Sequence, residues 1–174
     1  MNRTGSDRGF SLIELMVTIA IIGIMLVLAL PYVGRAAGQA SERLVKQRFV
    51  QDFTWARGAA GAADAQALDA SLASGTPVLT MVLNADCTWT TKISGTANSQ
   101  HSMSTTELAR IAPAIACAGS GGLALPVTFT FSPQGFVSGT GTLTLTGASG
   151  QAFQLQILYS GSVLQTHAAS GVES

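Results

Sequence analysis

Residues 10–30 read FSLIELMVTIAIIGIMLVLAL, and this apolar stretch decides how the chain is organised. As an α-helix its 21 residues would extend roughly 31 Å, about the thickness of the hydrocarbon core of a bilayer. Arg3 and Arg8 precede it, so the positive-inside rule places the N-terminus in the cytoplasm and the following chain across the membrane. A cleaved secretory signal is the alternative, but its apolar region is usually about 7–15 residues long. No A-x-A cleavage pattern follows Leu30.

The composition of the chain excludes several classes of protein. Its 174 residues include 9 Lys and Arg against 9 Asp and Glu, so the formal net charge is zero. Charged residues make up only 10% and hydrophobic residues 47%. A disordered chain needs high charge and low hydrophobicity, and a nucleic-acid-binding module is usually basic, so the composition favours neither. The length suits one domain and one additional element.

Glu14 is the only charged residue in the apolar stretch, and Gly9 directly precedes the stretch. An ionisable group in a membrane helix costs roughly 2.5–3.5 kcal/mol at the bilayer centre, so its presence points to a function. Snorkelling of Glu14 to the membrane interface is the structural alternative. The run Gly9-Phe10-Ser11-Leu12-Ile13-Glu14-Leu15 resembles the prepilin signature of type IV pilins and type II secretion pseudopilins.

The resemblance implies how the chain is processed and assembled. Prepilin peptidase, a membrane aspartyl peptidase, would cut between Gly9 and Phe10, remove residues 1–9 as a leader, and leave a Phe10 amine that is then N-methylated. The amine of a neighbouring subunit would neutralise Glu14 inside an apolar bundle, where an unpaired carboxylate is costly. Pro31, which removes a backbone donor, would mark a kink or a segment that unwinds on assembly.

Residues 31–62 are predicted to form an amphipathic stalk helix that fades near Gly61. Glu42 and Lys46 have the favourable i, i+4 spacing and are assigned to its polar side. The cluster of Phe49, Phe53 and Trp55 is interpreted as packing against a sheet, with a partner-binding groove as the alternative. One apolar stripe is predicted from steps of three and four residues: Val45, Phe49, Phe53, Ala56 and Ala60.

Beyond Pro77 the apolar period changes to two, which indicates antiparallel strands that are buried on one face. The sequence therefore predicts an α+β, pilin-like fold in which a β-rich head over residues 63–174 packs on the helix. Ser132-Pro133-Gln134-Gly135 predicts a β-turn. Residues 98–122 have no clear period, and Thr106–Ala112 fit either a short helix or a strand. The expected strands lie at Val78–Leu83, Thr88–Ile93, Val127–Phe131, Leu143–Leu145 and Phe153–Tyr159.

Cys87 and Cys117 are the only cysteines in the chain. Beyond a bacterial inner membrane the compartment is oxidising, so two cysteines favour a disulfide. Two buried free thiols are the alternative. A disulfide would restrain the stretch whose period is unclear.

The head resembles the minor pilin and pseudopilin H group (GspH/FimT/FimU type). The resemblance rests on a strand that leads into a Phe-x-Pro-x-Gly turn, here Phe131-Ser132-Pro133-Gln134-Gly135. Major pilins often place their disulfide near the C-terminus, whereas Cys117 lies 57 residues from the end of this chain. The resemblance therefore implies a minor subunit.

The end of the head departs from this group. Its DNA-binding members resemble one another in a Gly-Arg-x-Arg element after the last strand, whereas Gly161-Ser162-Val163-Leu164 holds no arginine. No Lys or Arg follows Arg110, and duplex affinity depends on cations that neutralise phosphates. Direct DNA binding is therefore not expected. The remaining basic residues are interpreted as a solvated helix face: Arg43, Lys46, Arg48 and Arg57.

The sequence offers no catalytic or metal-binding pattern. His101 and His167 have no metal-ligand spacing to each other or to the cysteines, and no nucleophile elbow or phosphate loop occurs. No enzymatic activity, cofactor or metal is therefore expected. A membrane-anchored binding protein is the second hypothesis, although an ordinary anchor needs neither cleavage after Gly9 nor Glu14.

These observations predict a structural minor subunit of a type IV pilus, near the fibre tip or in the initiation complex. A minor pseudopilin of the H type in type II secretion is the alternative. The expected location is the bacterial inner membrane with the head in the periplasm, and then the pilus or pseudopilus. The expected partners are prepilin peptidase and other pilins or pseudopilins, which would bind through the N-terminal helix.

Overall fold

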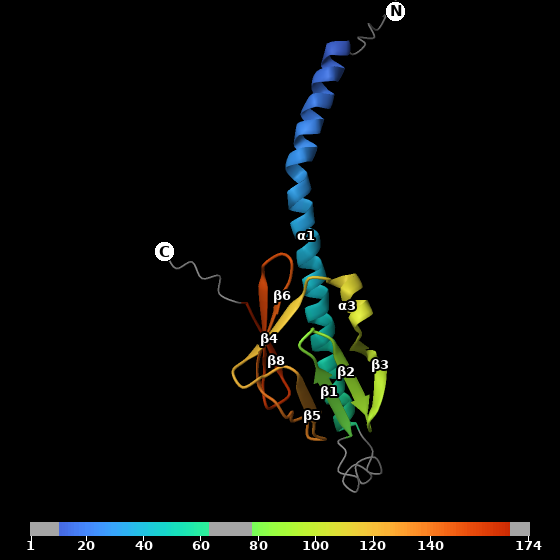
Figure 1. Cartoon of the computed structure of the whole chain (residues 1–174), viewed down its shortest axis with the longest axis vertical. Coiled ribbons are helices and arrows are strands. Elements are labelled where there is room, and N and C mark those ends of the chain that lie inside the picture. The colour runs from blue at the N-terminus through green and yellow to red at the C-terminus, as the bar shows by residue number, and fades with distance from the viewer. Residues whose placement is uncertain (1–10, 63–77, 168–174) are drawn as a thin grey trace, which may run out of the picture. The chain divides into compact units, whose positions relative to one another are not determined.

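The computed structural model describes residues 11–62 and 78–167, with the backbone alone at positions 30–37 and 167 (Figure 1). Gly9, Phe10 and the expected leader lie outside the described residues. The α+β prediction is confirmed, because one long helix is followed by antiparallel strands. The elements are α1 (Leu12–Gly61), β1 (Leu79–Leu83), β2 (Trp89–Ile93), β3 (Thr96–Met103), α3 (Thr105–Ile111), β4 (Ala116–Ser120), β5 (Val127–Phe131), β6 (Gly141–Thr146), β7 (Ala152–Ile157) and β8 (Val163–His167).

The chain divides into two compact units, residues 1–37 and residues 38–174. In the first unit, the window Leu12–Ala29 has a mean hydropathy of 2.7 and none of it is buried. The helix is therefore long and apolar enough to cross a membrane. The second unit contains the C-terminal half of α1 as well as the strands, so the helix over residues 38–61 belongs to the same unit as the head.

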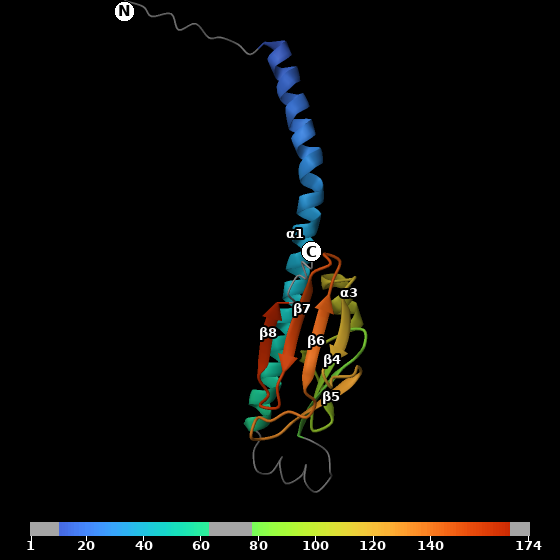
Figure 2. The same ribbon diagram turned by 90° about the vertical axis from the view of Figure 1, so that its left-hand side faces the viewer.

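The described strands of the head form two antiparallel four-stranded sheets. Their orders are β3-β2-β1-β5 and β4-β6-β7-β8. Figure 2 shows the second sheet lying across the C-terminal part of α1. Within that sheet Leu143 pairs with Leu155, and within the first sheet Met81 pairs with Phe129. All four of these side chains are buried, so both sheets turn an apolar face toward the core.

The apolar stripe of α1 is the centre of this core, as its period predicts. Its five residues are each at most 1% exposed. The Phe49 ring meets the Trp89 ring edge-on at 5.4 Å, and Phe53 meets Phe129 and Phe131 at 5.3 and 5.0 Å. Such edge-to-face pairs add about 0.5–1.5 kcal/mol each beyond their buried area. The stripe therefore anchors the helix on β2 and β5.

The stretch without a clear period contains β4, α3 and most of β3. Helix α3 resolves the ambiguity at Thr106–Ala112, and its N-cap is Ser104, whose Oγ accepts a hydrogen bond from the Glu107 amide at 3.2 Å. Ser104 and Glu107 have the spacing of a capping box, which was the available sequence signal. Strand β4 consists of small residues, so its sequence shows no apolar alternation.

The predicted β-turn at residues 132–135 is confirmed. The Gly135 amide donates to the Ser132 carbonyl at 2.9 Å, and Gly135 has a φ of +83°, which favours glycine. A second feature differs from the prediction, because Val163 and Leu164 begin β8. The position compared with the Gly-Arg-x-Arg element is therefore a turn and the start of an edge strand, not a tail beyond the last strand.

Candidate functional site

Glu14 lies in the first turn of α1, where its amide donates to the Ser11 carbonyl at 3.0 Å. The apolar side chains around it are exposed, Leu12 by 76% and Ile13 by 68%. A helix of a soluble protein would bury such side chains, and this exposed apolar segment is consistent with a membrane anchor. Pro31 lies inside α1, and the backbone is helical on both sides of it.

Glu42 is buried, so its assignment to the polar side of the helix is wrong. It is 3% exposed, and Oε1 and Oε2 accept hydrogen bonds from the Ser149 amide at 2.8 Å and the Ser149 hydroxyl at 2.5 Å. The physical reason is its spacing, because Glu42 precedes Val45 by three residues and so continues the buried stripe. Glu42 thereby fastens α1 to the β6–β7 turn.

Gly147 is required for this contact, because a Cβ there would overlap the Glu42 carboxylate. We expect Gly147→Ala to lower the unfolding free energy of residues 38–174 by about 1–3 kcal/mol, as overpacking does. Urea denaturation measures the change. Gly58→Ala is the matched control, since nothing lies within 4 Å of the added Cβ in the same unit. An equal or greater loss in the control would contradict the steric explanation.

A second buried carboxylate, Asp52, gathers three nitrogen atoms around it. Its side chain is 2% exposed. The Arg48 Nε atom lies 3.1 Å from Oδ2, Trp89 Nε1 donates to Oδ2 at 2.9 Å, and His101 Nδ1 lies 3.1 Å from Oδ1. This network was not predicted from the sequence, although Asp52 follows Phe49 by three residues and therefore lies on the buried face. The network joins α1 to β2 and β3.

An irregularity in β3 brings His101 to this network. Trp89 pairs with Met103 and Thr91 pairs with Asn98, so extra residues of β3 bulge between the two pairs. Bulges re-aim side chains, and here His101 stacks on Trp55 with ring centroids 3.6 Å apart. Trp55 is partly buried, and it packs against the hydrophobic core as well as on the His101 ring. Among the described residues, no group of three or more His, Cys, Asp or Glu side chains is placed to hold a metal ion.

Three of the four basic residues of α1 contact other parts of the head while they remain partly exposed to solvent. Lys46 Nζ lies 4.8 Å from the centroid of the Phe153 ring, and Arg48 Nη2 donates to the Gln100 carbonyl at 2.6 Å. Arg57 lies beside the loops that hold Gly135 and Gly161. Of the four, Arg43 alone is classed as exposed.

The structure joins Cys87 and Cys117 in a disulfide, with Cα atoms 5.4 Å apart. Cys87 lies in the turn between β1 and β2, and Cys117 lies in β4, so the bond links the two sheets. In the same turn, the Thr88 hydroxyl and amide donate to Asp86 at 2.6 and 3.0 Å. These bonds lower the pKa of Asp86, so their stabilisation is present above its unfolded pKa and is lost as the pH falls.

The loss of unfolding free energy on removal of the disulfide depends on the length of the loop that the bond closes. The bond closes a sequence separation of 30 residues, for which the chain-entropy relation gives about 3–4 kcal/mol. We expect the double variant Cys87→Ala/Cys117→Ala of residues 38–174 to lose that much unfolding free energy in urea. The reduced natural sequence should lose a similar amount. A double variant with an unchanged midpoint would contradict a stabilising role.

Comparison with known proteins identifies a family motif near the N-terminus. Residues 5–30 match the family model described as the prokaryotic N-terminal methylation motif. A search of curated proteins found no match, and a search of solved structures found none. The matched residues include the Gly9–Phe10 bond and Glu14. This motif is the signature of prepilin-type proteins, so the N-terminal segment of this chain is similar to that of type IV pilins and pseudopilins.

Proposed function

We propose that the chain is a non-enzymatic minor subunit of a type IV pilus, positioned near the fibre tip or in the initiation complex. The observation that carries the proposal is the methylation motif at residues 5–30, which continues into a wholly exposed apolar helix. Prepilin peptidase cleaves the chain after Gly9 and so frees the Phe10 amine. This amine is then methylated. Before assembly the helix spans the inner membrane with the head in the periplasm.

Glu14 supplies the register between subunits in this proposal. An exposed carboxylate on an apolar helix loses its water when other helices surround it, and a cationic amine then offsets that loss. The Phe10 amine of the neighbouring subunit is the cation that processing creates. Because a pair forms at one axial position only, each subunit adopts a fixed offset from the next.

We expect Glu14→Ala to reduce recovery in sheared fibres at least about tenfold, the factor that corresponds to 1.4 kcal/mol. The measurement is an immunoblot of sheared fibres and of membranes from cells that make pili. Thr18→Ala is the matched control, because Thr18 is exposed one turn further along the same helix and donates only to the Leu15 carbonyl. Equal recovery of Glu14→Ala and Thr18→Ala would count against the role of Glu14.

The minor assignment is supported by the place of the disulfide and by the Phe-x-Pro-x-Gly turn. The bond joins the β1–β2 turn to β4 and does not close a C-terminal loop. The second candidate is a minor pseudopilin of type II secretion, which would use the same N-terminal motif. Deletion in the source bacterium distinguishes the two functions. Fewer fibres with normal secretion of folded proteins supports the pilus, and the reverse result supports the pseudopilus.

A further inference from the structure

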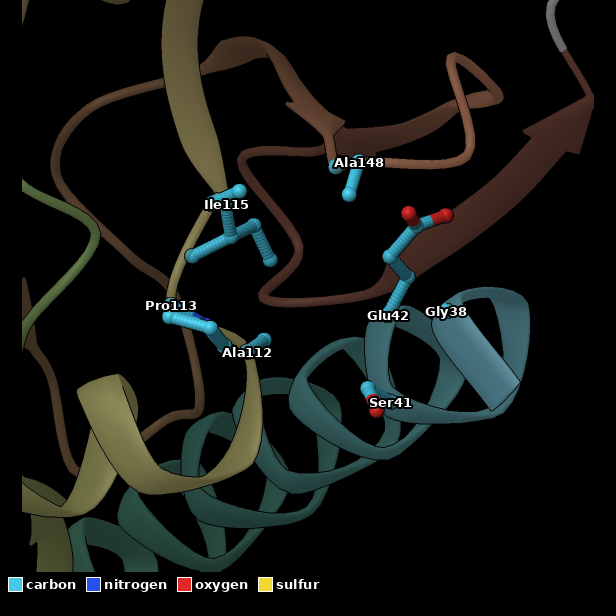
Figure 3. A pocket seen from close by; sticks show the side chains of 9 residues that line it. Gly38, Ser41, Glu42, Ala112, Pro113, Ile115 and Ala148 are labelled. Carbon is cyan, nitrogen blue, oxygen red and sulfur yellow. The ribbon is translucent and has the colours of Figure 1, made fainter. Parts of the chain in front are cut away.

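A small apolar pocket lies between three parts of the head. Its volume is about 170 Å³, and it is formed by α1 near Gly38, by the segment after α3 and by the β6–β7 turn. Figure 3 shows Glu42 rising from α1 on one side, with Ala112, Pro113 and Ile115 opposite and Ala148 near the Glu42 carboxylate. The pocket is open on one side to solvent, and Ala114 at its rim is exposed.

Glu42 gives this apolar pocket a negative end. An ionised carboxylate has about four acceptor positions, and Ser149 occupies two of them. Among the described side chains, no Lys, Arg or His nitrogen lies within salt-bridge distance of Glu42. Asp52, the other buried carboxylate of α1, has Arg48 and His101 at 3.1 Å. The two sites therefore differ, since among the described residues the Arg48 guanidinium lies beside Asp52 and no cationic side chain lies beside Glu42.

The pocket combines apolar walls with a carboxylate that has no cationic neighbour in the part of the chain that the structure describes. Ligands that match both features have an aliphatic body and a positive end, as Lys and Arg side chains do when their stems lie along apolar surface. A neutral apolar ligand would leave the charge of Glu42 uncompensated, and a small hydrated cation would leave the walls uncovered. Charge complementarity therefore selects an alkyl cation.

We propose that this pocket receives the end of a Lys or Arg side chain from a neighbouring pilin-type subunit. This assignment of the partner rests on the proposed function, whereas the preference of the pocket for alkyl cations does not. In the complex, the aliphatic stem lies against Ala112, Pro113 and Ile115, and the charged end approaches Glu42. A contact of this kind would add a second charged pair to each subunit boundary, within the head.

The chemical preference is tested on the full chain in micelles of an uncharged detergent. The probes are n-butylguanidinium and the neutral N-butylurea, which has a similar shape. We expect n-butylguanidinium to shift the methyl NMR signals of Ala112, Ile115 and Ala148 in a saturable way, with at least about tenfold weaker binding of N-butylurea. Equal binding of both probes, or shifts spread over other methyl groups, would overturn the proposal.

Two variants keep this result interpretable. Glu42→Gln retains an acceptor for the Ser149 amide but removes the charge, and it should abolish the preference for the cation. If that variant does not fold, Ala114→Leu fills the pocket from its exposed rim and should prevent binding, whereas Ala116→Leu on the exposed side of β4 should not. Undiminished binding by Ala114→Leu would place the probe elsewhere and overturn the site.

The partner is tested in fibres with a photo-crosslinking residue at position 114. We expect an adduct with a pilin-type subunit, next to a Lys or Arg in the crosslinked peptide, and a weaker adduct when Glu42→Gln is also present. An adduct with another class of protein, or none in chains recovered from fibres, would overturn the assignment of the partner. If no chain enters fibres at all, the proposed function fails, and the NMR result still decides the chemical preference of the pocket.

Discussion

Replacing Gly9 by valine is expected to leave nearly all of the chain as uncleaved precursor. A β-branched side chain would stand at the bond that a peptidase must approach closely, where glycine presents only backbone. Without cleavage Phe10 has no free amine, so the cation that would pair with Glu14 is missing. Arg3 and Arg8 also stay attached to the helix.

Intact-mass spectrometry of membrane extracts measures this result. The natural sequence should lack residues 1–9 and carry a methyl group on Phe10, whereas Gly9→Val should retain the complete leader. Ser6→Ala is the control, because it changes the leader away from the cleaved bond and should be processed normally. A normal Phe10 N-terminus in Gly9→Val would disprove the proposed processing.

Replacing Asp52 by alanine is expected to lower the unfolding free energy of the head by about 3–5 kcal/mol, the cost of breaking a buried charge pair. The change strands the buried indole Nε1 of Trp89 and removes the carboxylate that Arg48 and His101 approach at 3.1 Å. It also removes one of the contacts that hold β3, an edge strand, on α1. The expected loss is the largest of any single substitution considered for the head.

Urea denaturation of residues 38–174 measures the loss, since this unit contains all the described core residues. Asp52→Asn keeps an acceptor for Trp89 and should lose less than Asp52→Ala. Gln51→Ala is the matched control on the exposed side of the same turn of α1, and it should change stability little. A loss below about 1 kcal/mol in Asp52→Ala would show that water replaces the carboxylate, contrary to the buried network.

The sequence predicted the structure correctly where a period or a motif depends on residues that are close together in the chain. The stripe from Val45 to Ala60 follows from helical geometry, and the strands around Met81, Phe129 and Leu155 follow from alternation. The N-terminal motif was also readable, because a charge in an apolar stretch is conspicuous. These features depend only on residues close together in the chain.

Features that depend on distant residues were not predicted. Glu42 and Asp52 are charged, and their burial depends on Ser149, Trp89 and His101, which α1 meets only in the folded head. Their helical spacing from Val45 and Phe49 indicated burial. Their acidic side chains instead favoured an exposed position. Strands β3, β4 and β8 were not predicted, because their small or polar residues carry no clear alternation of apolar and polar side chains.

The bond between Cys87 and Cys117 also sets how far the head can stretch. When a subunit unfolds under tension, its chain extends by about 3.3–3.6 Å per residue. A covalent link between the sheets prevents the segment that it closes from extending. With a separation of 30 residues, the link withholds about 100 Å of length. An oxidised head that unfolds under load therefore lengthens less, and recoils over a shorter distance, than a reduced one.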